Sequence, residues 1–243
     1  MKRAIFAAAF VLMLFGGVAQ AQPATPAVDP ASFSTDVTNP YFPLPLGAVR
    51  VYEGWERDPD TGEVHQNRVE ETVLTETDTV MGVEVVVMHV MEYSDGELIE
   101  ETRDYHAQHA DGSVWYFGEH VDKIENGQVI NHDGTWLAGE DGNLPSIFMP
   151  AAPQLLDTIQ QEQAPGLAED FSTIAETGIT FKAMSGAIGG YDNCIRTVDV
   201  NPLEVVSEFK TYCPGPGLVR EEDATSVDEL VSITLPGMAT PAA

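Results

Sequence analysis

Apolar and polar residues alternate with a period of two along most of the chain from residue 49 onward. The alternating stretches are rich in β-branched and aromatic residues. They are separated by turn signals such as Asp95-Gly96, Asp111-Gly112 and Asn126-Gly127, which are typical of tight hairpins. This pattern predicts a meander of antiparallel strands. The strands are expected over residues 49–55, 64–77, 83–93, 97–108, 114–119, 120–125 and 128–131.

The second half of the chain is less regular but keeps the strand signal. Residues 154–163 fit either a short helix or a strand, because Leu155, Leu156 and Ile159 form a helical stripe within a segment short enough for a strand. The fold class we predict is mainly β: a curved antiparallel sheet or open barrel-like meander with at most one short helix. Further strands are expected over residues 171–184, 194–200, 206–213, 218–220 and 230–235.

The N-terminal residues have the features of an export signal. Lys2 and Arg3 precede the apolar residues 4–18, and Ala19-Gln20-Ala21 carries small residues at the two positions that a signal peptidase recognises. A membrane anchor is the alternative, but the apolar stretch is shorter than the roughly 20 residues that a spanning helix needs. We therefore predict a signal peptide over residues 1–21, no integral membrane segment after cleavage, and a secreted or periplasmic protein.

Composition divides the remaining chain into three parts. Residues 22–35 are rich in Pro, Ala and small polar residues, which predicts a flexible leader. Residues 36–236 carry the strand pattern and are expected to form a single β-rich domain, because one core can grow to this size. Within it, residues 39–47 contain three prolines, so we expect an extended segment packed across the core. Residues 237–243 are expected to be a flexible tail.

The two cysteines, Cys194 and Cys213, are expected to form a disulfide bond. Exported proteins acquire disulfides in an oxidising compartment. If Val200 pairs with Ser207 in the predicted hairpin, the register also places Cys194 directly opposite Cys213, at a spacing that a bridge can accept. A metal-thiolate or redox pair is the alternative, but the CxxC spacing or nearby histidines that such sites use are missing.

The balance of charges excludes one class of partner. The chain has 11 Lys and Arg against 39 Asp and Glu, a formal net charge of −28. Nucleic acids and anionic lipid headgroups are bound by Lys and Arg that neutralise phosphates. Neither is therefore an expected partner of this acidic protein.

One predicted hairpin carries a candidate ligand set for a divalent cation. With Asp111-Gly112 as a two-residue turn, Asp104 lies opposite Glu119, and His106 follows on the same face. Carboxylate oxygens and imidazole nitrogens are suitable ligands for such a cation. The alternative is a solvent-facing strand in which these residues are merely polar, because acidic residues are abundant throughout the chain.

Four motifs occur in an order that suggests relatives. Across residues 33–222 the chain resembles a group of uncharacterised secreted bacterial β proteins. It is similar, more distantly, to the lipoprotein carriers of the bacterial periplasm. The resemblance implies an exported protein with an open, curved antiparallel sheet, and it implies no reaction. The motifs are Trp115-Tyr-Phe-Gly-Glu119, Ala164-Pro-Gly-Leu-Ala-Glu-Asp170, Gly190-Tyr-Asp-Asn-Cys194 and Tyr212-Cys-Pro-Gly-Pro-Gly-Leu-Val219.

The sequence favours binding over catalysis. It contains neither a GxSxG nucleophile elbow nor an HExxH zinc motif. The leading hypothesis is a non-catalytic exported β protein without a cofactor, which binds a hydrophobic or envelope-derived small ligand, or a protein partner. The alternative is a divalent-cation-binding protein or a metal-dependent hydrolase that uses Asp104, His106 and Glu119. In the leading hypothesis the ligand lies on a concave face lined by Trp55, Trp115, Tyr116 and Phe117.

Overall fold

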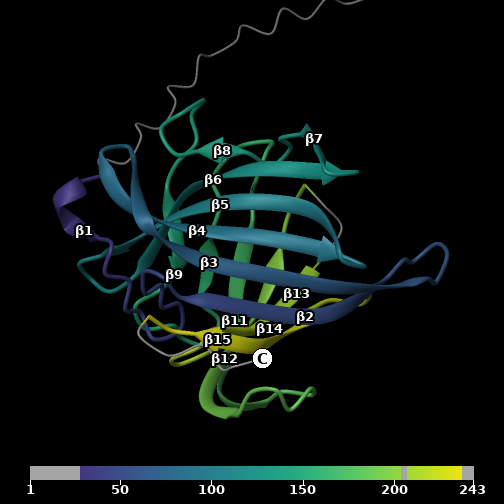
Figure 1. Ribbon diagram of the computed structural model, residues 1–243. Helices are drawn as coiled ribbons and strands as arrows, with labels where there is room; N and C mark the ends of the chain where they lie inside the picture. Colours follow the sequence, from purple (N-terminus) through teal and green to yellow (C-terminus); the bar gives the residue numbers. More distant parts are fainter. Residues whose placement is uncertain (1–27, 204–206, 237–243) are drawn as a thin grey trace, which may run out of the picture.

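The chain folds into one open antiparallel sheet that curves strongly (Figure 1). The structure, a computed structural model, describes residues 28–203 and 207–236. The predicted signal peptide and the predicted tail lie outside these residues. The mainly β fold class predicted from the alternation of apolar and polar residues is confirmed. The only helix among the described residues is the 3-10 turn η1, Pro30–Ser32. No helix in the described ranges is long and apolar enough to cross a bilayer.

The first half of the sheet is a meander of consecutive strands. Positive φ angles at Asp95-Gly96 and Asn126-Gly127 place tight turns where the sequence predicts them, and Met81-Gly82 forms another. The two-residue turn expected at Asp111-Gly112 is instead a three-residue loop, because His109 N–H donates to the Ser113 carbonyl oxygen and Gln108 pairs with Val114. The two short strands expected over residues 114–125 are one continuous strand. The strands are β2 (Val49–Arg57), β3 (Val64–Val80), β4 (Val83–Ser94), β5 (Glu97–His109), β6 (Val114–Glu125) and β7 (Gln128–Asn131).

The second half is another meander, which begins at the segment that fits a helix or a strand. That segment contains a short strand, β10 (Thr158–Gln160), paired with β11 (Phe171–Lys182). Two further short strands, β8 (Trp136–Leu137) and β9 (Ser146–Met149), pair with β6. The remaining strands are β12 (Gly190–Val200), β13 (Ser207–Cys213), β14 (Gly217–Glu222) and β15 (Ser226–Thr234).

The two meanders join where the last strand of the chain pairs with the first long one. β15 runs antiparallel to β2, from Ser226 opposite Glu56 to Thr234 opposite Val49. The sheet order is therefore β10-β11-β12-β13-β14-β15-β2-β3-β4-β5-β6-β7. In Figure 1, β11, β13 and β14 lie behind β2–β6, so the sheet has an inner face on which the two halves look toward each other. We call this the concave face.

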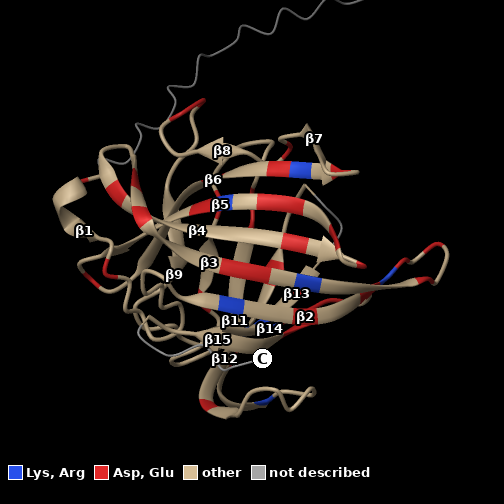
Figure 2. Ribbon diagram, viewed as in Figure 1, with Lys and Arg blue, Asp and Glu red and all other residues tan. Residues whose placement is uncertain are grey.

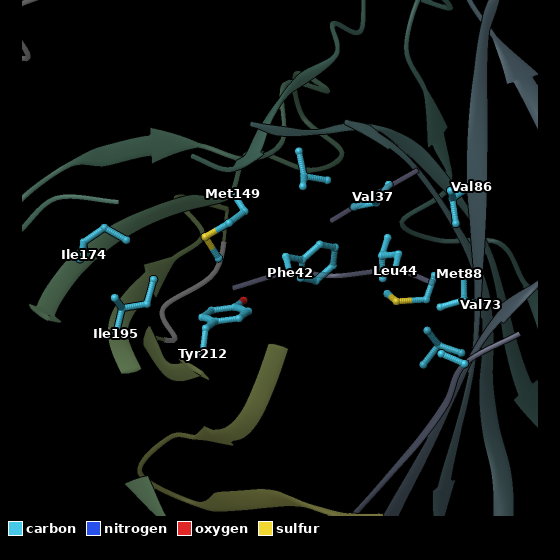
Figure 3. Packing of buried hydrophobic residues seen from close by; sticks show 13 residues of the cluster. Val37, Phe42, Leu44, Val73, Val86, Met88, Met149, Ile174, Ile195 and Tyr212 are labelled. Carbon is cyan, nitrogen blue, oxygen red and sulfur yellow. The ribbon is translucent and has the colours of Figure 1, made fainter. Parts of the chain in front are cut away.

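The proline-containing segment fills part of the space between the two halves, as predicted. Figure 3 shows Phe42 and Leu44 between Met88 on one wall and Tyr212 on the other. Leu44 is 1% exposed, and all four residues belong to one buried cluster. Burial of a side chain of this size stabilises the fold by roughly 2 kcal/mol.

Part of the predicted flexible leader is structured. Strand β1, Phe33–Ser34, pairs with β5, and Phe33 lies across His109 on that strand. The Phe33 ring packs edge-on against Trp115 and Phe117, with ring centroids 5.6 and 5.4 Å away. This aromatic contact partly buries an apolar side chain that composition alone assigned to a flexible leader.

Candidate functional site

The concave face contains a cavity of about 370 Å³ next to the buried cluster. This volume falls within the range of small-molecule binding sites. Phe42, Met88 and Tyr212 belong to both the cluster and the cavity wall, so one side of the cavity is apolar. The apolar wall is completed by Tyr52, Val69, Val90, Tyr93, Ile99, Phe148 and Leu218.

The rest of the cavity wall is strongly acidic. Figure 2 shows Asp and Glu on the neighbouring strands β3, β4 and β5, with few basic positions among them. The lining contains one basic residue, Lys210 of β13. The acidic lining residues are Glu56, Glu71, Glu92, Glu100, Asp104, Glu119, Glu221 and Asp228.

Strand register places two of these acids directly opposite each other. Glu92 of β4 pairs with Glu100 of β5, and Glu100 pairs in turn with Lys123 of β6. The Lys123 ammonium forms an ion pair with Glu100, which leaves Glu92 without an ion pair among the described residues. Burial, reinforced by the charge of Glu100, raises the pKa of Glu92 to about 7.

Asp104 and Glu119 of the predicted cation site also face each other. They pair across β5 and β6 in the predicted register, and both line the cavity. Burial raises the pKa of both carboxyl groups, that of Glu119 to about 7, and the Glu119 charge adds to the rise at Asp104. The Tyr116 hydroxyl donates a hydrogen bond to Asp104 Oδ1 at 3.5 Å. Two like charges at one position of a sheet make protonation of one of them favourable.

His106 shares the concave face but lies among aromatic rings. Its imidazole stacks on Tyr116 with centroids 4.7 Å apart and meets Phe42 and Phe148 edge-on. His106 is 1% exposed, and burial lowers its pKa to about 3. Its Nδ1 has no hydrogen-bond partner in the described part of the chain. Within the described ranges, no three His, Cys, Asp or Glu side chains form a group arranged to hold a metal ion.

Lys210 lines both the cavity and a second hollow of about 310 Å³. Its Nζ lies 3.4 Å from Glu208, 3.6 Å from Glu221 and 3.7 Å from Asp199. The second hollow is acidic as well, because Glu162 and Asp170 line it. Burial and a hydrogen bond with Asp170 raise the pKa of Glu162 to about 10.

One buried polar atom of the cavity wall, Asp228 Oδ1, has no hydrogen-bond partner among the described residues. Tyr212 is 2% exposed, and no described residue hydrogen-bonds its hydroxyl. By contrast, the Tyr52 hydroxyl donates to Glu71 and to the Leu218 carbonyl oxygen, both at 3.2 Å. In Figure 3 the Tyr212 hydroxyl points to the side of Phe42, which also lines the cavity. Buried polar atoms normally have a partner, so Asp228 Oδ1 is available to a ligand donor, and the Tyr212 hydroxyl lines the same cavity.

The structure does not bring the four predicted aromatic ligand-binding residues together, and none of them lines the cavity. Trp55 is 38% exposed, with the Arg57 guanidinium 5.9 Å from its ring. Trp115 and Phe117 lie on the opposite face from His106 and contact Phe33. Tyr116 alone lies on the concave side, stacked on His106.

A β-bulge explains why the predicted face was wrong for Trp115 and Phe117. The register is as expected at Asp104 and Glu119, but it shifts by one residue before His106. His106 pairs with Tyr116, whereas the predicted two-residue turn would pair it with Phe117. Gly118 has a φ of +116°, and a Cβ there would lie 2.3 Å from the Trp136 carbonyl oxygen. A one-residue shift exchanges the two faces of a strand. In the sequence, the sign of this bulge is Gly118, a glycine within an aromatic strand.

The predicted disulfide is confirmed. Cys194 and Cys213 are bonded, and the pairing of Val200 with Ser207 sets the expected register. Both cysteines are fully buried next to Tyr52, Phe181 and Leu230. The bond ties together β12 and β13, and β13 carries Lys210 and Tyr212 into the cavity wall.

Comparisons with known proteins show no family. No protein-family model and no curated protein matches the sequence. Among solved structures, the fold is similar to a candidate lipoprotein from Parabacteroides distasonis. The two share 15% sequence identity, the match covers 80% of this chain and 98% of the other, and the TM-score is 0.39. A likeness of this size carries no argument about what the chain binds.

Proposed function

We propose that this chain is an exported, non-catalytic binding protein that holds a small amphiphilic ligand in the cavity of its concave face. The single observation that carries the proposal is the cavity itself, which has an apolar wall on one side and ionisable groups on the other. Sites for small molecules combine these two features: the apolar wall supplies affinity and a few polar groups fix the orientation.

The location outside the cytoplasm in this proposal rests on two features. The N-terminal sequence has the pattern of an export signal. The buried disulfide fits an oxidising compartment such as the periplasm or the extracellular space. An exported sheet with an internal cavity is suited to carry or sequester a molecule that partitions between water and a membrane.

A divalent cation is the second candidate for this site. The observation that favours it is the direct pairing of Asp104 with Glu119 across β5 and β6. His106, the third predicted ligand, instead has its ring among Tyr116, Phe42 and Phe148. Elemental analysis of the dialysed exported protein tests this candidate: stoichiometric metal would favour it over the amphiphile.

Binding of an uncharged, environment-sensitive fluorophore such as N-phenyl-1-naphthylamine tests the proposed function. We expect saturable binding to one site. Val69→Trp places an indole at the cavity wall and should weaken binding at least tenfold. Val64→Trp, on the same strand but 42% exposed, is the matched control and should bind as the wild type does. Unchanged binding in a folded Val69→Trp variant, or no binding in the wild type, would contradict the proposal.

A further inference from the structure

The uneven charge of the cavity wall carries information about the ligand. Eight acidic residues and one lysine line the cavity. Arg50 is also buried nearby, 3.9 Å from Glu71, but its guanidinium donates to the carbonyl oxygens of Pro43 and Pro216. Among the acids that line the cavity, Arg50 therefore supplies a counter-charge to Glu71 alone. Buried carboxylates without counter-charges are costly.

The acids that lack a basic partner lie close to the apolar wall. Along β4, Glu92 follows Met88 and Val90 on the concave face, and all three line the cavity. Across the sheet, Met88 pairs with Asp104, which pairs in turn with Glu119. A ligand that contacts Met88 with an apolar part would therefore bring its other end within reach of these carboxylates.

A buried polar atom without a partner is an independent sign of a ligand: Asp228 Oδ1 lines the cavity and has no hydrogen-bond partner among the described residues. The Tyr212 hydroxyl lines the cavity on the opposite wall from Met88 (Figure 3), and no hydrogen bond joins it to another described residue. It can accept a hydrogen bond from a ligand N–H or donate one to a ligand oxygen. The carboxylates, when ionised, only accept hydrogen bonds. A ligand with N–H donor groups could therefore form hydrogen bonds with both the tyrosine hydroxyl and the carboxylates.

From this arrangement we infer that the ligand is an organic cation: an amine or a related N–H donor attached to an apolar chain or ring. The inference rests on the proposed function and adds the charge of the ligand. The ammonium lies against Glu92, Asp104 and Glu119, and the apolar part lies against Phe42 and Met88. A bare metal ion would leave the apolar wall unused. An anionic amphiphile would be repelled by the surrounding carboxylates.

Three probes with the same alkyl chain test the inference on the mature protein: octylamine, 1-octanol and octanoate. At pH 8, we expect octylammonium to displace the bound fluorophore at a concentration at least tenfold lower than octanol. Octanoate should not displace it. Octanol or octanoate as effective as octylamine would overturn the inference about charge but leave the proposed function standing. A fluorophore that does not bind at all would instead overturn the proposed function.

Variants of the acidic wall test the assignment of residues. Glu92→Gln and Glu119→Gln should each weaken octylammonium binding about tenfold, the change expected when one hydrogen bond to a charged group is lost. Binding of octanol should be unaffected. Glu84→Gln, at the exposed opposite end of β4, is the matched control and should change neither affinity. If both cavity variants bind octylammonium as tightly as the wild type, these residues do not hold the cation.

Discussion

Asp104 on β5 and Glu119 on β6 lie directly opposite each other on the concave face, so two carboxyl groups occupy one cross-strand position. Opposed like charges destabilise a sheet, and burial increases the effect. The arrangement is tolerated because one of the two groups can hold a proton or face a cation. The same logic applies to Glu92 and Glu100, two same-face positions further along the sheet, where Lys123 forms an ion pair only with Glu100.

Replacing one member of the first pair should stabilise the protein without ligand. At pH 8.5 the solution favours ionisation of both carboxyl groups, and the two charges repel each other. Glu119→Gln removes one of them and should therefore raise the free energy of unfolding by about 1–2 kcal/mol. The gain should shrink at pH 5.5, where the raised pKa, about 7, already keeps Glu119 protonated. Urea unfolding at the two pH values measures the difference. Glu125→Gln, at the exposed end of β6, is the control. An equal increase in the free energy of unfolding for this variant would show that repulsion between Asp104 and Glu119 is not the cause.

Stability should fall as the pH rises from 5.5 to 8.5. Burial raises the pKa of Glu92 to about 7, of Asp228 to about 6 and of Glu221 to about 8. Between the ordinary carboxyl pKa and these values, the folded chain holds protons that the unfolded chain releases, so each step up in pH favours unfolding. For Glu92, the charges facing it are Glu100, Lys123, Asp228 and Lys210.

We expect a melting temperature roughly 5 °C or more higher at pH 5.5 than at pH 8.5, measured by calorimetry at constant ionic strength. The difference in melting temperature between the two pH values should be smaller when octylamine is present at pH 8.5. The bound ammonium then balances the charge of carboxylates that are protonated at pH 5.5. A melting temperature that rises with pH over this range would contradict the placement of these carboxyl groups.

The disulfide should contribute substantially to stability. Cys194 and Cys213 are 19 residues apart, and closing a loop of that length restricts the unfolded chain by about 3 kcal/mol. The double Cys→Ser variant should lose about this much and keep its β-sheet circular dichroism. The bond itself is checked by the intact mass after alkylation of the denatured, unreduced protein. Two alkylated thiols on freshly exported protein would show that the pair does not form.

Several elements of the fold could be predicted because they depend on local chemistry. The hairpin at Asp95-Gly96 needs a positive φ at both turn residues, which Asp and Gly adopt readily. The register that pairs Val200 with Ser207 follows from the turn between them and brings the cysteines together. The three prolines of residues 39–47 excluded a central strand, and this segment crosses the core.

The cavity could not be predicted, because it depends on pairing between distant parts of the chain. Met88 and Tyr212 face each other only because β15 pairs with β2 and closes the sheet far enough. No local pattern distinguishes Glu92, which lines the cavity, from the many acids that face solvent. Phe117 was assigned to the wrong face because a single bulge changes the alternation along β6.

The role of Gly118 in that bulge can be tested directly. Gly118→Ala adds a Cβ that would lie 2.3 Å from the Trp136 carbonyl oxygen, at a φ that only glycine adopts freely. The free energy of unfolding should fall by about 3 kcal/mol. Gly189→Ala is the matched control, because open space surrounds that position. Its effect should stay within about 0.5 kcal/mol. Equal stability of the two variants would show that the bulge does not need glycine.

The most direct test of the central claim is a crystal structure of the mature protein with 8-bromooctylamine, in which the bromine is located by its anomalous signal. We predict one bromine on the concave face, against Phe42 and Met88, with the amine directed to Glu92 or to the pair Asp104 and Glu119. A bromine bound only on the outer surface, or no ordered bromine in crystals grown at saturating ligand, would contradict the assignment of this cavity as a binding site.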